Sequence, residues 1–322
     1  MIAFIFPGQG SQKVGMGKAL AEAFPEARAV FDEADTAFSA GVAVSPLLSS
    51  LCFEGPDDQL MLTEHTQPAI LTVSVAATRV LATIGVTPHV VAGHSLGEYS
   101  ANVVSGVLRF GDAVQMVRRR GRYMQEAVPV GEGAMAAILG LDPEAVQRAC
   151  DEAAQGDVVS PANINSPDQV VISGSAAAVQ RASERAKVLG AKRAVPLPVS
   201  APFHCAVMKP AEERLEPELR ALTVEDPSFP IIANVDARPK RDGAAAIDAL
   251  VHQVSAPVLW EGIVRHLAST GVTTYVEVGP GRVLGGLVKK IHKDAQVLAF
   301  VAPEDLEAIL KVETGKSKVK SK

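Results

Sequence analysis

The stretch Val90-Val91-Ala92-Gly93-His94-Ser95-Leu96-Gly97-Glu98 decides the fold. Its three leading apolar residues indicate the end of a buried strand, and the residues that follow it can continue as a helix. Between the two lies the spacing G-x-S-x-G, which is typical of a nucleophile elbow, a sharp strand-to-helix turn with a strained serine at its apex. Glycines fit there because a Cβ would clash where the two arms of the turn approach each other. We therefore predict that Ser95 is a nucleophile; the alternative is a Gly-Ser turn without chemistry.

Length and composition indicate one large domain or two unequal domains around a sizeable core. The chain has 322 residues, of which 48% are hydrophobic and 21% charged, with a formal net charge of -5. This charge argues against a general binder of nucleic acid or anionic membranes. The three cysteines have no C-x-x-C spacing, so the sequence predicts no metal site and no disulfide framework, and a reducing cytoplasm is expected. The apolar start 2–6 predicts a first strand, and no apolar run is long enough to span a membrane.

A glycine-rich loop, Pro7-Gly8-Gln9-Gly10-Ser11-Gln12, follows the first expected strand. The dinucleotide-binding pattern G-x-G-x-x-G fails in it, because Lys13 stands where the third glycine should be. We interpret the loop as a close-approach turn that presents Gln9 and Gln12, the alternative being a plain structural turn. Helices are expected over 17–40 and over 68–84, where Pro68 would lie in the first turn.

A further helix is expected from Asp112, as its N-cap, to about Ala127, and it contains one arginine on its apolar side. At 3.6 residues per turn, Arg120 shares a stripe with Met116 and Met124, whereas the neighbouring arginines point elsewhere. A buried guanidinium needs an anionic partner. That partner is either an internal carboxylate or a substrate carboxylate, and the sequence alone does not decide between them.

The segment 131–199 has the pattern of a small domain inserted into a larger one. Its periodicity predicts, in order, strand 134–139, helix 143–154, strands 157–164 and 169–173, helix 176–189 and strand 192–199. This βαββαβ order is the ferredoxin-like motif. The large domain then comprises 1–130 and 200–311, and the Lys-rich segment 312–322 is expected to be a disordered tail.

The remaining candidates are a histidine and a second glycine-rich loop. Among seven histidines, His204 lies in a proline-stiffened loop where the chain re-enters the large domain, so it is the best candidate for a base. His94 is adjacent to the serine and is expected to point away from it. Strands are expected at 231–235 and 274–278. The loop 279–281 after the second strand either binds phosphate at a helix N-terminus or allows tight strand–helix packing.

Five motifs together resemble the malonyl-CoA:acyl-carrier-protein transacylases of bacterial fatty-acid synthesis and the acyltransferase domains of polyketide synthases. In chain order they are Phe6 to Gln12, Gly93 to Ser100, Arg120 to Gln125, Ser200 to Cys205 and Glu277 to Gly281. The resemblance runs from residue 1 to about residue 300. It implies a hydrolase-like, three-layer α/β domain with a mostly parallel sheet and a ferredoxin-like insert.

The resemblance also implies residue roles. Ser95 would be the nucleophile, His204 its base and Arg120 the clamp for the malonyl carboxylate. Gln9 and the backbone N–H of Leu96 would form the oxyanion hole, and the backbone carbonyl of Gln253 would orient the histidine in place of a triad carboxylate. The substrate would also contact Met124, Phe203, His94 and Asn165. Phe203 stands before the histidine, as in malonyl-selective polyketide domains, and should crowd a 2-methyl branch.

The resemblance predicts a cytoplasmic, monomeric enzyme that transfers malonyl groups from malonyl-CoA to acyl carrier protein, without a metal or redox cofactor. Because acyl carrier proteins are acidic, we expect basic residues to steer their docking, and the candidates are Lys192, Arg193, Lys289 and Lys290. Two other classes share some of these features. A serine hydrolase would have the same elbow and histidine, and a non-catalytic carrier-binding subunit would have the same fold.

Overall fold

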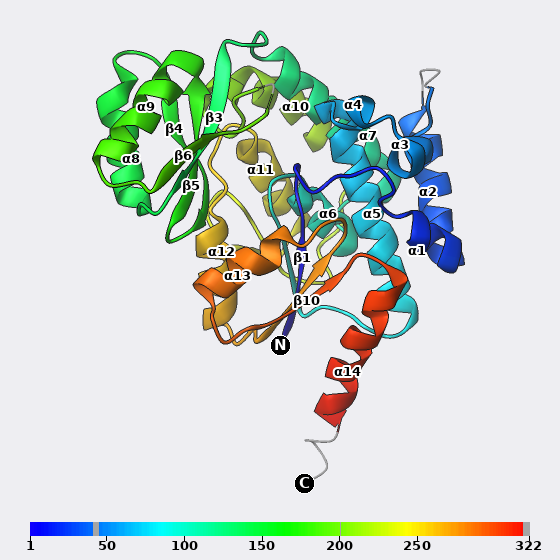
Figure 1. Ribbon diagram of the computed structural model, residues 1–322. Helices are drawn as coiled ribbons and strands as arrows, with labels where there is room; N and C mark the ends of the chain where they lie inside the picture. Colours follow the sequence, from blue (N-terminus) through cyan, green and yellow to red (C-terminus); the bar gives the residue numbers. More distant parts are fainter. Residues whose placement is uncertain (41–44, 200, 318–322) are drawn as a thin grey trace.

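The structure of the protein is a computed structural model that describes residues 1–40, 45–199 and 201–317 (Figure 1). Ser200, which begins one of the motifs, lies outside the described residues. Two sheets are present, and each has its own set of helices. None of the described helices is long and apolar enough to cross a membrane.

The larger sheet is parallel except at one edge. Its strand order is β10-β9-β1-β2-β7-β8, and only β8 runs antiparallel to its neighbour. The strands are β1 (Ile2–Phe6), β2 (Val90–Gly93), β7 (Ile231–Ile232), β8 (Pro239–Lys240), β9 (Thr274–Val278) and β10 (Gln296–Phe300). Strand β1 lies inside the sheet, and all five of its side chains are buried, as is usual for a parallel strand covered on both faces.

Helices cover both faces of this sheet, so the large domain has three layers. Because side chains alternate along a strand, Phe4 and Phe6 of β1 pack into one core and Ala3 and Ile5 into another. The second core is completed by α12 (Trp260–Ser269) and α13 (Val283–Ile291). The first core is formed largely by α1 (Lys18–Ala23), α2 (Pro25–Phe38), α3 (Leu48–Glu54), α4 (Asp57–Leu60), α5 (Thr63–Thr83), α6 (Leu96–Val104), α7 (Phe110–Glu126), α10 (Lys209–Arg220) and α11 (Gly243–Gln253).

The smaller sheet is antiparallel and has its own core, which confirms the predicted ferredoxin-like insert. Its strand order β4-β5-β3-β6 is that of a βαββαβ unit. The elements are β3 (Gly133–Leu139), α8 (Pro143–Ala154), β4 (Val159–Ser166), β5 (Gln169–Ser175), α9 (Ala176–Val188) and β6 (Arg193–Pro196). Both helices begin at a side-chain cap, since the Asp142 and Ser175 side chains accept hydrogen bonds from backbone N–H groups of the first turn.

The junction of β2 and α6 has the geometry of a nucleophile elbow. Ser95 lies between the two elements with φ 51° and ψ -109°, a strained conformation for a residue with a side chain. A Cβ on Gly93 would lie 1.9 Å from the carbonyl carbon of Gly97, and a Cβ on Gly97 would lie 2.1 Å from the carbonyl oxygen of Phe6 in β1. Both glycines are therefore required by close backbone approach.

Several expected boundaries differ from the structure. Helix α5 begins at Thr63, so Pro68 lies inside it and leaves one backbone hydrogen bond of the helix unmade, and the added turn carries the buried Gln67. Helix α7 begins at Phe110 and Asp112 is in its first turn, where an acidic residue favours the helix dipole without capping it. The helical periodicity of 17–40, in which Pro25 marks a break, corresponds to two helices that are separated directly before this proline.

Two further boundaries differ at the carboxyl-terminal side. Strand β7 ends at Ile232 instead of residue 235, and the side chain of Asn234, beyond its end, bonds to the backbone of the elbow at Gly93 and Ser95. Short 3₁₀ turns at Ala206–Met208 and Pro303–Asp305 precede α10 and α14 (Leu306–Ser317). Because α14 extends to Ser317, the expected disordered tail does not begin at residue 312, and residues 318–322 lie outside the described residues.

Candidate active site

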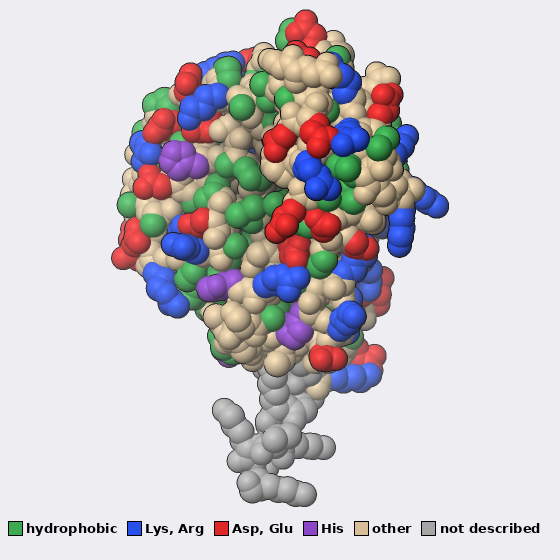
Figure 2. Space-filling model, turned by 90° about the vertical axis from the view of Figure 1, so that its left-hand side faces the viewer, with side chains coloured by type: hydrophobic (Ala, Val, Ile, Leu, Met, Phe, Trp, Pro, Cys, Tyr) green, Lys and Arg blue, Asp and Glu red, His purple; other side chains and the backbone are tan. Residues whose placement is uncertain are grey.

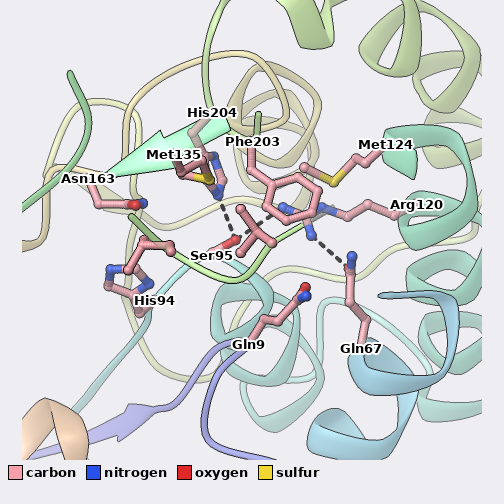
Figure 3. Close-up of a pocket in the computed structure, with 12 residues that line it drawn as sticks. Gln9, Gln67, His94, Ser95, Arg120, Met124, Met135, Asn163, Phe203 and His204 are labelled. Atoms are coloured by element: carbon pink, nitrogen blue, oxygen red, sulfur yellow. Dashed lines mark hydrogen bonds between the residues drawn. The ribbon is translucent and has the colours of Figure 1, made fainter. Parts of the chain in front are cut away.

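The elbow serine lines a cavity between the two sheets. The cavity has a volume of about 120 Å³ and is lined by Gln9, Gln67, His94, Ser95, Arg120, Met124, Met135, Asn163, Leu197, Val199, Phe203 and His204 (Figure 3). These residues come from the loop after β1, from the elbow, from α5 and α7, from the small sheet, and from the segment that leads back into the large domain. The structure therefore brings together residues that are far apart in the sequence.

Ser95 and His204 form a hydrogen-bonded pair. The Oγ of Ser95 lies 2.7 Å from Nε2 of His204. On the other side of the ring, Nδ1 lies 2.9 Å from the carbonyl oxygen of Gln253 and 3.2 Å from that of Ala256. Carbonyl oxygens only accept hydrogen bonds, so the proton of the neutral ring is on Nδ1, and Nε2 is left to accept from the serine hydroxyl.

Burial keeps His204 neutral. It lowers the pKa of the ring to about 3, and the positive charge of Arg120 adds to this effect, although the hydrogen bond to Gln253 opposes it. A neutral imidazole hydrogen-bonded to a hydroxyl is the form that can remove a proton. The geometry therefore suits His204 as a general base, as its position in the sequence suggested.

Two groups near Ser95 can donate hydrogen bonds to a developing oxyanion. Within the described part of the chain, the backbone N–H of Leu96, the first in α6, has no acceptor, whereas the N–H of Ser95 donates to the side chain of Asn234 at 2.7 Å. The Gln9 side chain lines the cavity and donates from Nε2 to Oγ1 of Thr63 at a long 3.3 Å. Leu96 and Gln9 thus occupy positions consistent with the predicted oxyanion hole.

Arg120 is the most unusual residue of the site, because it is a buried cation held by neutral groups. It is 2% exposed. One terminal nitrogen donates to Oε1 of Gln67 at 2.6 Å, and the other donates to Oγ of Ser95 at 3.3 Å (Figure 3). The second nitrogen also donates to Oε1 of Gln253 at 2.9 Å. Its Nε has no hydrogen-bond partner, and none of the salt bridges among the described residues includes it. The alternative of an internal carboxylate against this arginine is therefore wrong.

Four side-chain contributions to this site were not predicted from the sequence. They come from Gln67, Glu98, Asn234 and the amide group of Gln253, of which only the backbone carbonyl was expected to act. All four residues are buried polar residues within or beside apolar segments. Buried polar residues need hydrogen-bond partners. A polar residue within an apolar segment was therefore the signal by which the sequence could have indicated these contributions.

His94 faces the cavity, so the expectation that it points away from the site is wrong. Its Nε2 donates to Oδ1 of Asn165 at 2.8 Å, which links the elbow to strand β4 of the small sheet. Asn165 itself lines an adjoining cavity of about 300 Å³ between the 7–11 loop, the small sheet and α13. The two cavities share Gln9, His94, Asn163 and Leu197, so they lie side by side next to Ser95.

The loop at 279–281 serves packing and not phosphate binding. The buried carboxylate of Glu277 accepts hydrogen bonds from the backbone N–H groups of Val283, Leu284 and Gly285, and so occupies the N-terminus of α13. A Cβ on Gly279 would lie 2.3 Å from Oγ of Ser74. Both observations favour the tight-packing alternative.

Two of the four expected carrier-docking residues have partners within the protein. Lys290 forms a salt bridge with Asp168 of the small domain at 3.0 Å, and Lys289 donates to the carbonyl oxygen of Ala295 at 2.6 Å. Lys192 and Arg193 are exposed at the start of the edge strand β6. On the face shown in Figure 2, basic and acidic side chains are interspersed around apolar ones and do not form a single basic patch.

A strained serine paired with a neutral histidine on a hydrolase-like fold is the arrangement of enzymes that work through acyl-serine intermediates. Residues 3–310 match the family of the acyl transferase domain. The chain is 50% identical over 307 residues to the malonyl CoA-acyl carrier protein transacylase of Bacillus subtilis, covering 95% of each chain. It belongs to this acyl transferase family and is an acyltransferase.

Solved structures agree with this assignment. An acyl carrier protein S-malonyltransferase of Vibrio cholerae is 47% identical and superposes with a TM-score of 0.92, covering 96% of this chain and 99% of the other. A type II polyketide malonyl-transacylase, solved in complex with its acyl-carrier protein, is 46% identical with a TM-score of 0.92 and the same coverage. Both likenesses extend over the small sheet as well as the large one.

The low pKa of His204 predicts an unusual pH dependence. Because the ring stays neutral down to about pH 3, kcat/KM for acylation by p-nitrophenyl acetate should not fall between pH 8 and pH 5. In Arg120→Ala the positive charge is gone, so the pKa of His204 should rise. The fall of kcat/KM at acid pH should therefore begin at a higher pH than in the wild type. Initial release of nitrophenol, followed at its isosbestic wavelength, measures both profiles.

The control for this experiment is Arg122→Ala, which removes an exposed arginine of the same helix and should leave the profile unchanged. A wild-type rate that falls tenfold per pH unit below 6.5, as for an ordinary histidine, would contradict the prediction.

Proposed function

We propose that this enzyme transfers the malonyl group of malonyl-CoA to the phosphopantetheine thiol of acyl carrier protein, and so supplies extender units for fatty-acid or polyketide synthesis. The observation that carries this proposal is Arg120. Its buried charge lacks a carboxylate partner, and one of its nitrogens is 3.3 Å from Oγ of Ser95. A malonyl group bound at Ser95 would place a carboxylate where this cation needs one. The names of the relatives support the same reaction.

In the first half-reaction, Ser95 Oγ attacks the thioester carbonyl while its proton passes to Nε2 of His204. The oxyanion that forms is stabilised by the N–H of Leu96 and by Gln9. The C–S bond then breaks, and the coenzyme A thiolate takes the proton from His204. The product is a malonyl ester of Ser95.

The second half-reaction runs the same steps with a different thiol. His204 takes the proton of the pantetheine thiol, the sulfur attacks the ester carbonyl, and Ser95 regains its proton as the C–O bond breaks. The adjoining cavity of about 300 Å³ offers a route for the pantetheine arm from the surface to the serine. Side chains and backbone groups of this chain supply every step, so the proposed cycle calls for no metal or redox cofactor.

The acyl pocket suits a small acid. Phe203, Met124 and Met135 line the cavity near the serine, and the ring of Phe203 is 8% exposed (Figure 3). We expect them to crowd a 2-methyl branch, which would favour malonyl over methylmalonyl groups. A neutral acyl group would leave Arg120 unpaired, and this disfavours a general esterase or thioesterase.

We propose that the enzyme works as a monomer in the cytoplasm. All candidate site residues come from one chain, and the three cysteines are buried free thiols, as in proteins of a reducing compartment.

The test of this function is the acyl-enzyme. Intact-protein mass spectrometry after mixing with malonyl-CoA should show one added malonyl mass, on the peptide that contains Ser95, and adding acyl carrier protein should remove it. Ser95→Ala should give no adduct. An adduct that persists in this variant on Cys205 would overturn the assignment of the nucleophile, and loss of the adduct to water as fast as to the carrier would indicate a hydrolase.

Arg120→Ala should change the substrate class. The variant loses two hydrogen bonds between the guanidinium and the malonyl carboxylate, each worth on the order of 1.5–3 kcal/mol. Malonyl transfer should therefore fall by orders of magnitude. Acetyl transfer should persist or rise, because an acetyl group in the wild type leaves the buried charge unpaired. Arg120→Lys should restore malonyl transfer only in part, since lysine lacks the bidentate fork. Both half-reactions are measured with malonyl-CoA and acetyl-CoA; an equal fall with both donors would show that the arginine is only structural.

Carrier docking should depend on Lys192 and Arg193. Alternation along β6 places Arg193 on the same side of the strand as Leu197, which lines both cavities. Reversing both charges to Glu should slow the carrier half-reaction, most at low salt, and spare acylation by malonyl-CoA. Lys18→Glu with Arg28→Glu, on helices at the opposite side of Figure 1, is the matched control. Equal slowing of both half-reactions would refute a docking role.

A further inference from the structure

A buried carboxylate lies directly after the elbow and is not among the residues that line the cavity. Glu98 is 1% exposed and belongs to the first turn of α6. Its Oε2 accepts two hydrogen bonds, from Nε2 of Gln253 at 2.7 Å and from the backbone N–H of Asn234 at 3.1 Å. It forms no salt bridge with the cations of the described residues, and burial raises its pKa to about 7. The proposed reaction cycle gives this residue no role.

The side-chain amide of Gln253 stands between Glu98 and Arg120. Its Nε2 faces three oxygens: Oε2 of Glu98, the carbonyl oxygen of Ser95 at 2.9 Å and Oδ1 of Asn234 at 3.4 Å. An amide nitrogen donates and an amide oxygen accepts, so this arrangement permits only one orientation of the amide. The oxygen of Gln253 must then face Arg120, to which it lies at 2.9 Å.

We propose that Glu98 is a positioning residue for acyl selectivity: acting through the Gln253 amide, it aims the guanidinium of Arg120 at the acyl pocket. If the amide turned over, its N–H₂ group would face the arginine, and donor would oppose donor. Among the oxygens that prevent this, the carboxylate makes the shortest contact, and hydrogen bonds to charged groups are the strong ones.

The interposed amide also explains why the arginine stays available. A carboxylate in direct contact with Arg120 would form a bidentate pair and compete with the substrate carboxylate for the same nitrogens. With Gln253 between them, Arg120 gains a neutral acceptor and a counter-charge one residue away, yet its Nε remains unpaired. Glu98 thus partly compensates the buried charge without occupying the place of the substrate.

The inference rests on the proposed function, and its readout is the ratio of kcat/KM for malonyl-CoA to that for acetyl-CoA in acyl-enzyme formation. Glu98→Leu keeps the volume but leaves Nε2 of Gln253 without its shortest acceptor. We expect the ratio to fall about tenfold or more. Glu98→Gln keeps an acceptor oxygen in the same place, so it should retain most of the wild-type ratio.

A structural role alone would give a different result. Loss of folding, or of elbow geometry through Asn234, would lower malonyl and acetyl rates together and leave the ratio unchanged. Equal ratios in wild type and Glu98→Leu would therefore overturn the inference, as would an equal loss of ratio in Glu98→Leu and Glu98→Gln. If the wild type forms no malonyl-enzyme, the proposed function fails instead.

A second variant covers the case in which Glu98→Leu does not fold. Gln253→Leu removes the amide but keeps the backbone carbonyl that holds His204. It should lower the same ratio about tenfold, and an unchanged ratio would overturn the inference. Where both variants fold, the double variant should have the same malonyl-to-acetyl ratio of kcat/KM as Gln253→Leu alone, because Glu98 acts on Arg120 only through Gln253. Additive losses would show that Glu98 acts by another route.

Discussion

The site depends on one close backbone contact, between the elbow and the central strand β1. Gly97 lies so near Phe6 that a Cβ would be 2.1 Å from its carbonyl oxygen, and Gly93 faces Gly97 in the same way. This packing holds Ser95 at a positive φ, with its side chain in the cavity and its backbone tied to Asn234. The strain is sustained because the sheet and α6 fix both sides of the turn. The loop after β1 is placed by the same contact, and it carries Gln9 to the serine.

Neutral groups hold the charged and titratable parts of this site. Carbonyl oxygens fix the ring of His204, and amide oxygens hold Arg120. A carbonyl sets the tautomer of a histidine but stabilises an imidazolium less than a carboxylate would. Among the described residues, neither group has a carboxylate in direct contact: the buried ring of His204 remains neutral, and Nε of Arg120 remains without a hydrogen-bond partner. Gln253 contacts both residues: its backbone carbonyl accepts from the ring of His204, and its side-chain oxygen accepts from Arg120.

The sequence predicted the parts of the site that are encoded locally. The spacing around Ser95 and the apolar stripe around Arg120 follow from helix and strand periodicity, and the ferredoxin-like order was readable from alternating patterns. The partners of these residues were not readable, because they arise from contacts between distant segments: Gln253 meets Glu98 across 155 positions. The start of helix α5 was misjudged for the same reason, since the turn before Pro68 carries Gln67, whose side chain bonds to the distant Arg120. Only the fold brings such pairs together.

The small domain is linked by backbone hydrogen bonds to the segment that holds the ring of His204. Strand β4 forms a parallel backbone bridge to the segment that follows α11: Ile164 N–H donates to the carbonyl of Val258 at 2.9 Å, and Val258 N–H donates to that of Ala162 at 2.8 Å. Two residues before this bridge, the carbonyl of Ala256 contacts the His204 ring. The same strand supplies Asn165 to His94. A shift of the small domain would therefore also move a carbonyl group that orients the His204 ring, so the width of the cavities between the two sheets and the orientation of this ring depend on the same backbone contacts.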